Sequence, residues 1–404
     1  MLRRMRNILR TKENISNKTK VFVGLSGGVD SAVSAALLKE AGYDVTGVFI
    51  RIALPGYPCS AGSDKISAMR VAAHLHIPFR EIDLSKEYEK EVFRTSVREF
   101  ARGRTPNPDV LCNRDIKFGA FYNYAREQGA DFIATGHYAK VACERHPRKP
   151  LSKIVWPSLA DRAIVGELGE PRTFLKEVFS DAACLRVSAD TEKDQSYFLW
   201  MVPEEVLRHV IFPVGDLHKK DVRELANKFG LPNAARPDSQ GLCFLGDIAI
   251  EDMLERELSP QQGDIISENG NVIGRHDGAV LYTLGQRHGF TLFSQTPDTQ
   301  PHFVIGKNVE QNTVTVSVDR YPTGAKQTKI SLTDVNLLGE VEPGKCQARY
   351  RYRQTLIDAE LSIHGETAVV VLHEPQYVPI GQSLVLYRGD RCLGGGIVDT
   401  ATLI

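Results

Sequence analysis

The segment Val21–Ser31, V-F-V-G-L-S-G-G-V-D-S, combines the features of a phosphate-binding loop. Its apolar run, Val21–Leu25, predicts a buried strand, and an amphipathic helix is expected from Ser31 to a stop at Gly42. Backbone N–H groups and the dipole at a helix start attract an anion, and glycines let the backbone approach it. Neither G-x-x-x-x-G-K-[ST] nor G-x-G-x-x-G is present, which disfavours kinase-type and dinucleotide-binding loops. We predict a nucleotide-phosphate site, the alternative being an ordinary glycine turn.

A possible nucleophile, Cys112, lies near the end of the stretch T-P-N-P-D-V-L-C-N. The two prolines predict a rigid, non-helical loop in which Asn107 and Asp109 hold fixed positions. A helix is expected to open near Asn113, and a thiol near a helix N-terminus tends toward a low pKa. The alternative is a small buried hydrophobic residue.

A second such cysteine, Cys243, follows the turn residues Ser239 and Gly241 in P-D-S-Q-G-L-C-F. Its apolar neighbours also fit a core cysteine. Chemistry between the two thiols requires that the fold bring them together, which the sequence alone does not reveal.

Three arginines, Arg349, Arg351 and Arg353, alternate with Tyr350 and Tyr352. In a strand this alternation places the arginines on one face and the tyrosines on the other. An arginine face suits RNA phosphates, and tyrosines suit core packing or base stacking. A solvated strand face is the alternative.

The elements around these residues alternate between apolar runs and amphipathic stretches. Further strands are expected at 44–50, 79–84 and 131–135, and helices at 64–75, 86–102 and 115–128. This alternation predicts an α/β fold whose parallel sheet is covered on both faces. Ligands of such sheets bind at the carboxyl ends of the strands, where Ser26–Ser31, Ile50, Gly136 and His137 fall.

Changes in composition and hydrophobic pattern along the chain predict four regions. Residues 1–19 form a basic leader, and residues 20–247 form the nucleotide-binding domain, with an insertion or extended hairpin at 142–185. Residues 248–310 form a small central connecting domain. Short alternating strands from 311 to 404 predict a C-terminal β-barrel.

Composition excludes some classes of protein. The 404 residues contain 50 Lys+Arg and 50 Asp+Glu, so any basic surface is local. Seven cysteines without C-x-x-C spacing fit a reducing compartment better than a disulfide scaffold or zinc ribbon. No apolar run is long enough for a membrane span. The leader predicts a cytoplasmic protein with a disordered basic tail, the alternative being a mitochondrial presequence and a matrix location.

Eight motifs, in order, resemble those of the tRNA-specific 2-thiouridylases, the MnmA type. They are S-G-G-V-D-S, T-P-N-P-D-V-L-C-N, A-T-G-H-Y, K-D-Q-S-Y-F-L, D-S-Q-G-L-C-F, T-L-G-Q-R, R-Y-R-Q and C-L-G-G-G. The first resembles the loop of the ATP pyrophosphatases (PP-loop proteins). The resemblance implies an N-terminal parallel-sheet domain of the adenine nucleotide alpha hydrolase-like (PP-loop) type, the small central domain and the C-terminal barrel.

The same resemblance implies a set of binding residues. ATP, with Mg²⁺, would be bound by Gly24, Leu25, Ser26, Gly27, Gly28, Val29, Asp30, Ser31, Ile50 and Gly136. The target base would be bound by Asn107, Pro108 and Asp109. The tRNA would be contacted by Lys193, Asp194, Gln195, Arg351 and Tyr352. The family's usual Met-Lys-Asn-Trp is Ile50-Arg51-Ile52-Ala53 here, which leaves the adenine contacts open.

The resemblance further implies adenylation of the C2 oxygen of the wobble uridine, which releases pyrophosphate. Cys243 would carry a persulfide received from a donor protein of a cysteine desulfurase relay. Cys112 would either free sulfide from that persulfide or form a transient Cys112–Cys243 disulfide as sulfur leaves. Asp109 is the acid/base candidate, and no resident metal is expected.

Three alternatives remain open at this point. An amidating PP-loop enzyme needs an ammonia source and no paired cysteines. An iron–sulfur tRNA thiolase would use Asp109, Cys112 and Cys243 as cluster ligands, although the usual C-x-x-C is absent. A non-enzymatic RNA-binding module is supported only by the arginines, and it leaves the phosphate loop without a use.

Overall fold

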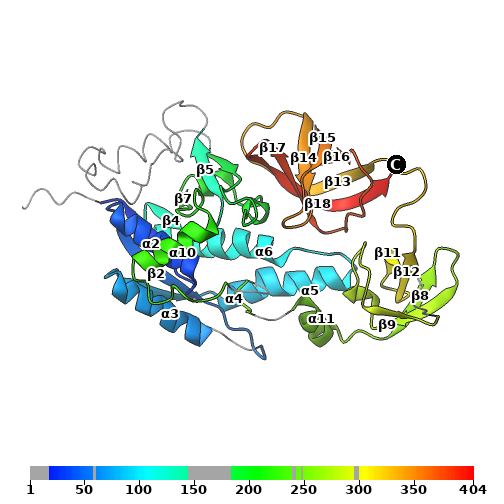
Figure 1. Cartoon of the computed structure of the whole chain (residues 1–404), viewed down its shortest axis with the longest axis horizontal. Coiled ribbons are helices and arrows are strands. Elements are labelled where there is room, and N and C mark those ends of the chain that lie inside the picture. Colours follow the sequence, from blue (N-terminus) through cyan, green and yellow to red (C-terminus); the bar gives the residue numbers. More distant parts are fainter. Residues whose placement is uncertain (1–17, 58–60, 144–182, 239–242, 247–248, 295–299) are drawn as a thin grey trace, which may run out of the picture.

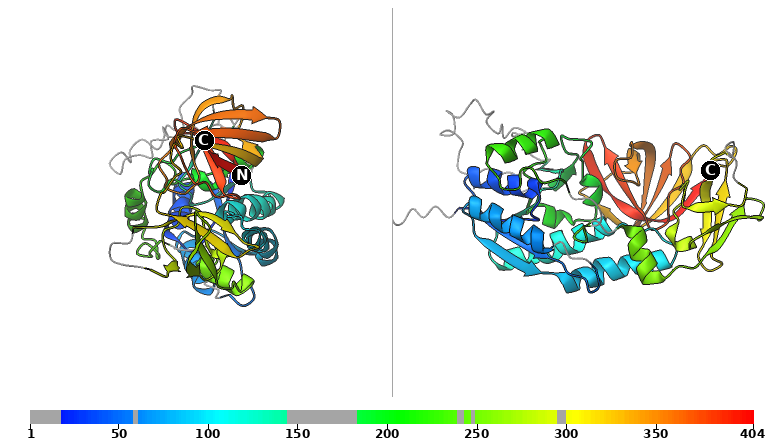
Figure 2. Two further views of the ribbon diagram at one scale, coloured as in Figure 1. Left: turned by 90° about the vertical axis from the view of Figure 1, so that its right-hand side faces the viewer. Right: turned by 60° about the horizontal axis from the view of Figure 1, so that its bottom comes forward.

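The computed structural model describes residues 18–57, 61–143, 183–238, 243–246, 249–294 and 300–404. Most of the predicted leader and most of the predicted insertion therefore lie outside the described residues. Three β-sheets make up the framework, and the barrel lies between the N-terminal sheet and the central sheet (Figures 1 and 2). No helix within the described ranges has the length and apolar character needed to cross a membrane.

The N-terminal sheet consists of five parallel strands in the order β3-β2-β1-β4-β7. They are β3 (Phe79–Asp83), β2 (Asp44–Arg51), β1 (Lys20–Gly24), β4 (Phe132–Ala134) and β7 (Val210–Ile211). The prediction of a parallel sheet is confirmed. Apolar side chains leave both faces of β1, with Val21 and Val23 in one core and Phe22 in the other.

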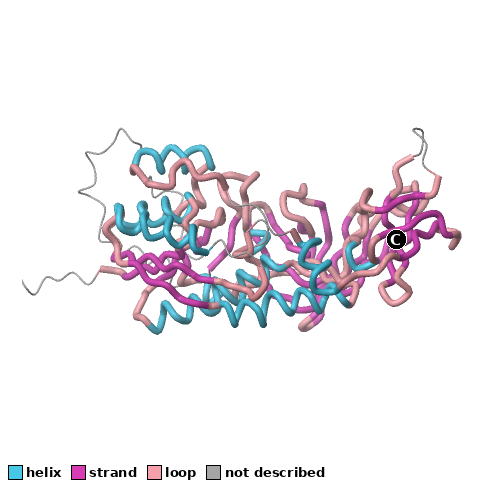
Figure 3. Tube along the Cα trace, turned by 90° about the horizontal axis from the view of Figure 1, so that it is seen from below, coloured by secondary structure: helices cyan, strands magenta, loops and turns pink. Residues whose placement is uncertain are grey.

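Helices cover both faces of this sheet. One core holds α2 (Val29–Glu40), α3 (Ala61–His74) and α10 (Lys219–Lys228). The other holds η1 (Tyr88–Phe93), α5 (Arg94–Ala101), α6 (Pro108–Leu111), η2 (Cys112–Ala120) and α7 (Phe121–Glu127). The short α4 (Ser85–Glu87) precedes η1 and has no buried residue. Seen from below, helices run along the molecule from the N-terminal sheet toward the central sheet (Figure 3). Further helical elements are η4 (Ser196–Phe198), α9 (Glu204–Leu207), α11 (Ile250–Leu258) and η5 (Ala279–Leu281).

The predicted non-helical loop before Cys112 is wrong in its second half. Asn107 is the N-cap of α6 and accepts a hydrogen bond from Val110 N (3.3 Å), and Pro108 follows as the first helical residue. Proline is favoured at that position because the N–H it lacks has no partner there anyway. The helical path therefore begins five residues before the predicted opening and continues through η2 into α7.

The central sheet has the order β10-β9-β8-β12-β11. Its strands are β8 (Gly263–Ser267), β9 (Val272–His276), β10 (Phe290–Leu292), β11 (Phe303–Asn308) and β12 (Thr313–Ser317). We expected residues 313–318 to belong to the barrel, but β12 pairs with β8 and β11. Its alternating valines pack on Ile265 and Val304, because alternation identifies a strand without identifying its sheet.

The C-terminal barrel is closed by pairing of its first and last strands, β13 with β18. Its strands are β13 (Thr328–Leu337), β14 (Gly344–Arg349), β15 (Ile357–His364), β16 (Thr367–Leu372), β17 (Ser383–Arg388) and β18 (Arg391–Leu403). A hairpin of β5 (Lys140–Cys143) and β6 (Ala183–Arg186) extends the sheet through β18. The hairpin interpretation of 142–185 thus holds for its two strands.

The predicted arginine strand is wrong beyond Arg349, where β14 ends. Residues 350–353 form a turn with Arg353 in the left-handed region (φ 62°). Arg349 is buried and forms an ion pair with Asp194, whereas Arg351 and Arg353 are exposed. The three arginines therefore do not share one face.

Candidate active site

The glycine-rich loop joins β1 to α2 at the carboxyl end of the sheet. No side chain caps α2, whose N-cap is Gly28, so its first N–H groups point at the loop as an anion site requires. Ser31 Oγ accepts a hydrogen bond from Ser26 N (3.3 Å) and donates one to Gly28 O (3.1 Å). These bonds hold the loop in its turn.

Two glycines are required by close backbone approach. Gly27 has φ +82°, and a Cβ there would lie 2.5 Å from Asp64 O. A Cβ on Gly136 would lie 2.7 Å from Ser31 N. The segment that follows the carboxyl end of β4 is therefore in contact with the glycine-rich loop. This contact was predicted, because ligands of parallel sheets bind at the carboxyl ends of the strands. By contrast, the Ile50 side chain is only 7% exposed and packs in the core.

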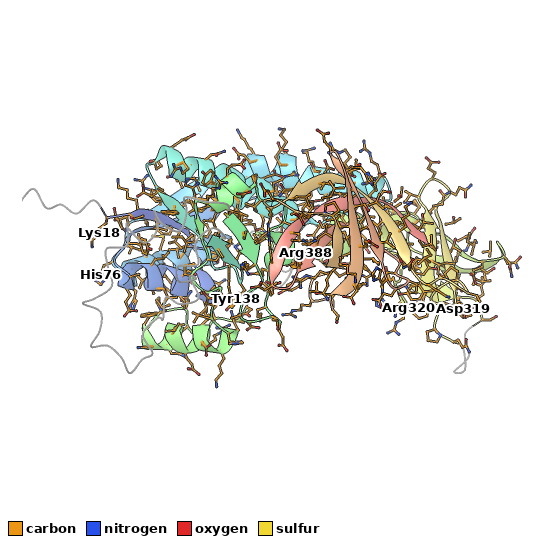
Figure 4. The ribbon with its side chains drawn as sticks, turned by 90° about the horizontal axis from the view of Figure 1, so that it is seen from above. Lys18, His76, Tyr138, Asp319, Arg320 and Arg388 are labelled. Atoms are coloured by element: carbon orange, nitrogen blue, oxygen red, sulfur yellow. The ribbon has the colours of Figure 1, made fainter. Side chains whose placement is uncertain are left out.

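Asp30, the acidic residue of the loop, lies in an ionic network. Lys219 Nζ lies 2.7 and 2.9 Å from its two carboxylate oxygens, and Tyr138 OH donates to it at 2.9 Å. Tyr138 lies beside α2, on the side nearer the barrel (Figure 4). Lys219 also contacts Asp238 (2.8 Å). Burial raises the pKa of Asp238, but hydrogen bonds from Lys219 and Lys193 outweigh it and lower that pKa to about 2.

The fold brings the two predicted cysteines together. Cys112 Sγ donates a hydrogen bond to Cys243 Sγ at 3.3 Å, although 131 residues separate them. Asp109 Oδ1 accepts from Cys243 N (3.3 Å), and Tyr88 OH donates to Cys243 O (2.9 Å). The helix that carries Asp109 and Cys112 thus fixes the backbone of Cys243, so the three predicted catalytic residues form one cluster.

The two thiols differ in their electrostatics. The hydrogen bond from Cys112 lowers the pKa of Cys243, and the Lys117 ammonium lowers it further against the effect of burial. Burial and the neighbouring Cys243 sulfur raise the pKa of Cys112 well above its usual range. The expected low pKa of Cys112 is therefore wrong: Cys112 is fully buried, and Cys243 is the thiol whose pKa is lowered.

Sequence reasoning missed Lys117 and gave His137 no role of its own. Lys117 Nζ lies 3.3 Å from His137 Nε2, and its positive charge lowers the pKa of Cys243. Lys117 follows Cys112 by five residues in η2, a π-helical segment, whose i→i+5 bonding favours that spacing. In an α-helix, Cys112 and Lys117 would lie on different faces. The sequence would therefore have predicted that they lie near each other only if the π-helical segment had been recognised.

The predicted base-binding residues lie at the start of the same helix. Asn107 Nδ2 donates to Gln382 Oε1 of the barrel (3.4 Å), and Thr105 N donates to Ile380 O (2.7 Å). Pro108 is buried. This segment therefore lies between the thiol cluster and the barrel.

The predicted tRNA-contact residues lie in several environments. Asp194 is 1% exposed and its carboxylate faces Arg349, so an RNA contact by this side chain would require their ion pair to open. Lys193 forms an ion pair with Asp238 (3.0 Å), and Gln195 accepts from Tyr138 N (2.9 Å).

The turn of the barrel is more accessible. Arg351 is exposed and donates to Leu284 O of the T-L-G-Q-R motif (3.2 Å). The Tyr352 ring packs against Phe198 with 4.8 Å between centroids. The turn therefore contacts both the central domain and η4.

Within the described ranges, no three or more His, Cys, Asp or Glu side chains are arranged to hold a metal ion. The cluster of Asp109, Cys112 and Cys243 thus presents two thiols to each other and a carboxylate to a backbone N–H.

Comparison with known proteins covers nearly the whole chain. Residues 19–162 and 172–247 match the family described as tRNA methyl transferase HUP domain. Residues 251–318 match the tRNA methyl transferase PRC-barrel domain, and residues 327–398 match the aminomethyltransferase beta-barrel domain.

Among curated relatives, the chain is 38% identical over 395 residues to tRNA-specific 2-thiouridylase MnmA of Streptococcus mutans, with 96% of each chain covered. It is 37% identical to the protein of that name from Lysinibacillus sphaericus, with 95% of each covered. A solved 4-thiouridine synthetase–RNA complex with bound ATP shares 16% identity over 57% of this chain and 46% of that one. The TM-score between the two structures is 0.31.

Proposed function

The chain belongs to the family of tRNA-specific 2-thiouridylases, which are tRNA sulfurtransferases, and we propose that it thiolates C2 of the wobble uridine in an ATP-dependent reaction. The observation that carries the mechanism is the 3.3 Å contact between Cys112 and Cys243. A chain of contacts links that pair to the glycine-rich loop, from Ser31 to Gly136 and then from His137 to Lys117.

The first step activates the uridine. ATP phosphates bind at Ser26–Ser31, where the uncapped start of α2 supplies N–H groups. An accompanying Mg²⁺ would neutralise phosphate charge; Asp30, in the first turn of α2, would hold it only after releasing Lys219 Nζ, which contacts both of its oxygens. The C2 oxygen attacks the α-phosphorus and pyrophosphate leaves, so that AMP becomes the leaving group at C2.

The two thiols differ in solvent exposure, and this difference assigns their roles in the sulfur transfer. Cys243 is partly exposed, whereas Cys112 is fully buried. A persulfide-bearing donor protein therefore reaches Cys243 first, and Cys243 becomes the sulfur carrier. The terminal sulfur of its persulfide attacks C2, the C2–O bond breaks, and AMP leaves with the electron pair.

Cys112 resolves the bond that remains. Its thiolate attacks Cys243 Sγ, which forms the Cys112–Cys243 disulfide and leaves the transferred sulfur on C2. In a second branch, Cys112 attacks first and expels HS⁻, which then attacks C2. Both branches end in the same disulfide, so a thiol reductant must return two electrons before the next turnover.

Asp109 is the acid/base group in this proposal. Burial raises its pKa, against the lowering effects of Lys117 and the Cys243 N–H. A carboxyl group with a raised pKa exchanges protons more readily near neutral pH. It lies where Asn107 and Pro108 are proposed to receive the target base, while Lys193, Gln195, Arg351 and Tyr352 are proposed to contact the tRNA body.

The proposal is tested by nucleoside mass spectrometry of tRNA incubated with the full chain, ATP, Mg²⁺ and a persulfide donor. Cys243→Ser should abolish 2-thiouridine while tRNA binding persists, and Cys346→Ala, a change within the barrel core, should retain product. Product from Cys243→Ser would contradict the assignment of the carrier. Pyrophosphate release without tRNA would favour the amidating alternative, and loss of activity on removal of bound iron would favour the cluster alternative.

A further inference from the structure

Lys117 is the cation of the thiol cluster, and no family motif pointed to it. Its ammonium lies 3.3 Å from His137 Nε2 and 5.8 Å from the ring centroid of Phe244, the residue that follows Cys243. The side chain is only partly exposed. A desolvated ammonium needs a counter-charge nearby, because burying an unpaired charge is costly.

The histidine beside it is held in one tautomer. An ammonium can only donate hydrogen bonds, so His137 Nε2 must accept from Lys117. Nδ1 then carries the ring proton and donates to Thr135 Oγ1 at 2.7 Å. Burial and the Lys117 charge hold the pKa of His137 well below its usual range, so the ring stays neutral. The Thr135–His137 pair thus orients one N–H of the Lys117 ammonium. The positive charge of that ammonium still acts on the two sulfurs.

We propose that Lys117 is a positioning residue that holds the Cys243 sulfur as an anion, with the Thr135–His137 pair fixing the direction of its ammonium. The ionisable groups that act on this position are Cys243, Cys112, Asp109, His137 and Tyr88. Of these, Cys112 is a protonated donor, His137 is neutral and Tyr88 keeps its proton. The sulfur of Cys243 and the carboxyl of Asp109 therefore compete for one cation.

The Lys117 ammonium would stabilise first the Cys243 thiolate and then the Cys112 thiolate. This consequence rests on the proposed function, in which Cys243 Sγ becomes part of a neutral S–S bond once its persulfide has attacked C2. The negative charge that raises the pKa of Cys112 is then gone, while the attraction of Lys117 for a Cys112 thiolate remains. Cys112 would thus become a better nucleophile once Cys243 has delivered its sulfur, which favours the first of the two proposed branches over the one in which Cys112 attacks first.

The direct test is the pH dependence of alkylation at Cys243. The full chain is treated with iodoacetamide from pH 5 to 10, and modification of the Cys243 peptide is followed by mass spectrometry. Because the thiolate is the reactive form, Lys117→Met should raise the reaction midpoint by at least about one pH unit and slow modification at pH 7 about tenfold. Lys117→Arg, which keeps the charge, should stay closer to wild type.

An unchanged midpoint in Lys117→Met would overturn the proposal. If that variant fails to fold, as judged by circular dichroism, Lys117→Gln keeps an amide donor and removes only the charge, and an unchanged midpoint there has the same meaning. The assay uses neither ATP nor tRNA. A negative tRNA thiolation assay would therefore not affect the conclusion from alkylation of Cys243. An unchanged alkylation midpoint would likewise not affect the conclusion from the thiolation assay.

Discussion

The ion pair between Asp194 and Arg349 gives a prediction about stability that separates a structural role from an RNA contact. Arg349 is 7% exposed and Asp194 1%. Asp194 Oδ1 accepts from Ser188 N (3.1 Å) and Ser196 N (3.3 Å), and Oδ2 accepts from Ser196 Oγ (2.7 Å) and from the guanidinium. This carboxylate therefore links the N-terminal domain to the barrel.

Asp194→Asn should be strongly destabilising. The amide has one acceptor oxygen, so its NH₂ group must face either the guanidinium or the two backbone N–H donors. Removing one partner of a buried ion pair costs about 3–5 kcal/mol, because the remaining charge is left uncompensated. Tyr387 OH contacts Arg349 Nη2 at 2.8 Å but carries no charge to replace the carboxylate.

The matched control is Glu224→Gln, the same carboxylate-to-amide change in the exposed Lys220–Glu224 pair, whose side chains are 85% and 61% exposed. It should cost about 0.2–0.5 kcal/mol. Urea unfolding of the full chain, followed through the transition that includes the barrel, measures both. If Asp194→Asn costs no more than Glu224→Gln, then the pair does not hold the two domains together and our reasoning fails.

Three further predictions concern the loop, the central domain and the barrel turn. Gly27→Ala should lose ATP binding at least tenfold in equilibrium titration, because its φ of +82° and the 2.5 Å approach to Asp64 O leave no room for a Cβ; unchanged affinity would contradict the close approach. Burial lowers the pKa of Lys307 from 10.5 to about 8. Between pH 8 and 10.5 the unfolded chain therefore binds more protons than the folded chain, and the free energy of unfolding should rise with pH in this range. In urea titrations Lys307→Met should lack that rise, and an equal rise would refute the assignment. Arg351→Ala should weaken tRNA binding and reduce the slope of log K against log salt by about one, and an unchanged slope would mean no phosphate contact.

Local sequence patterns predicted the N-terminal sheet well. The apolar run at 44–50 became β2, because a strand inside a sheet that is covered on both faces is mostly apolar. The run at 79–84 became β3, an edge strand in which only Phe79 and Ile82 are partly buried. The loop at Ser26–Ser31 could be placed because its glycines and the following helix form one continuous signal. Alternation at Thr313–Ser317 predicted a strand but assigned it to the wrong sheet, since pairing partners are set by long-range contacts.

The pairing of Cys112 with Cys243 was implied by the family resemblance, but it did not follow from the spacing or chemistry of the residues themselves. Asp109 of α6 and Tyr88 of η1 each form a hydrogen bond with the backbone of Cys243, and these two long-range contacts hold Cys243 beside Cys112. Their pKa difference depends on burial and on Lys117, neither of which follows from position near a helix N-terminus. The role of Arg349 was likewise hidden, because its alternation with tyrosines matched an exposed strand face while its partner lay 155 residues away.

The most direct test of the sulfur relay is a single turnover with enzyme preloaded with persulfide at Cys243. The full chain is mixed with ATP, Mg²⁺ and tRNA without reductant, and quenched samples are mapped by non-reducing peptide mass spectrometry alongside nucleoside analysis. The relay predicts one Cys112–Cys243 disulfide and one AMP for each 2-thiouridine formed. Formation of 2-thiouridine while both cysteines remain free thiols would contradict it.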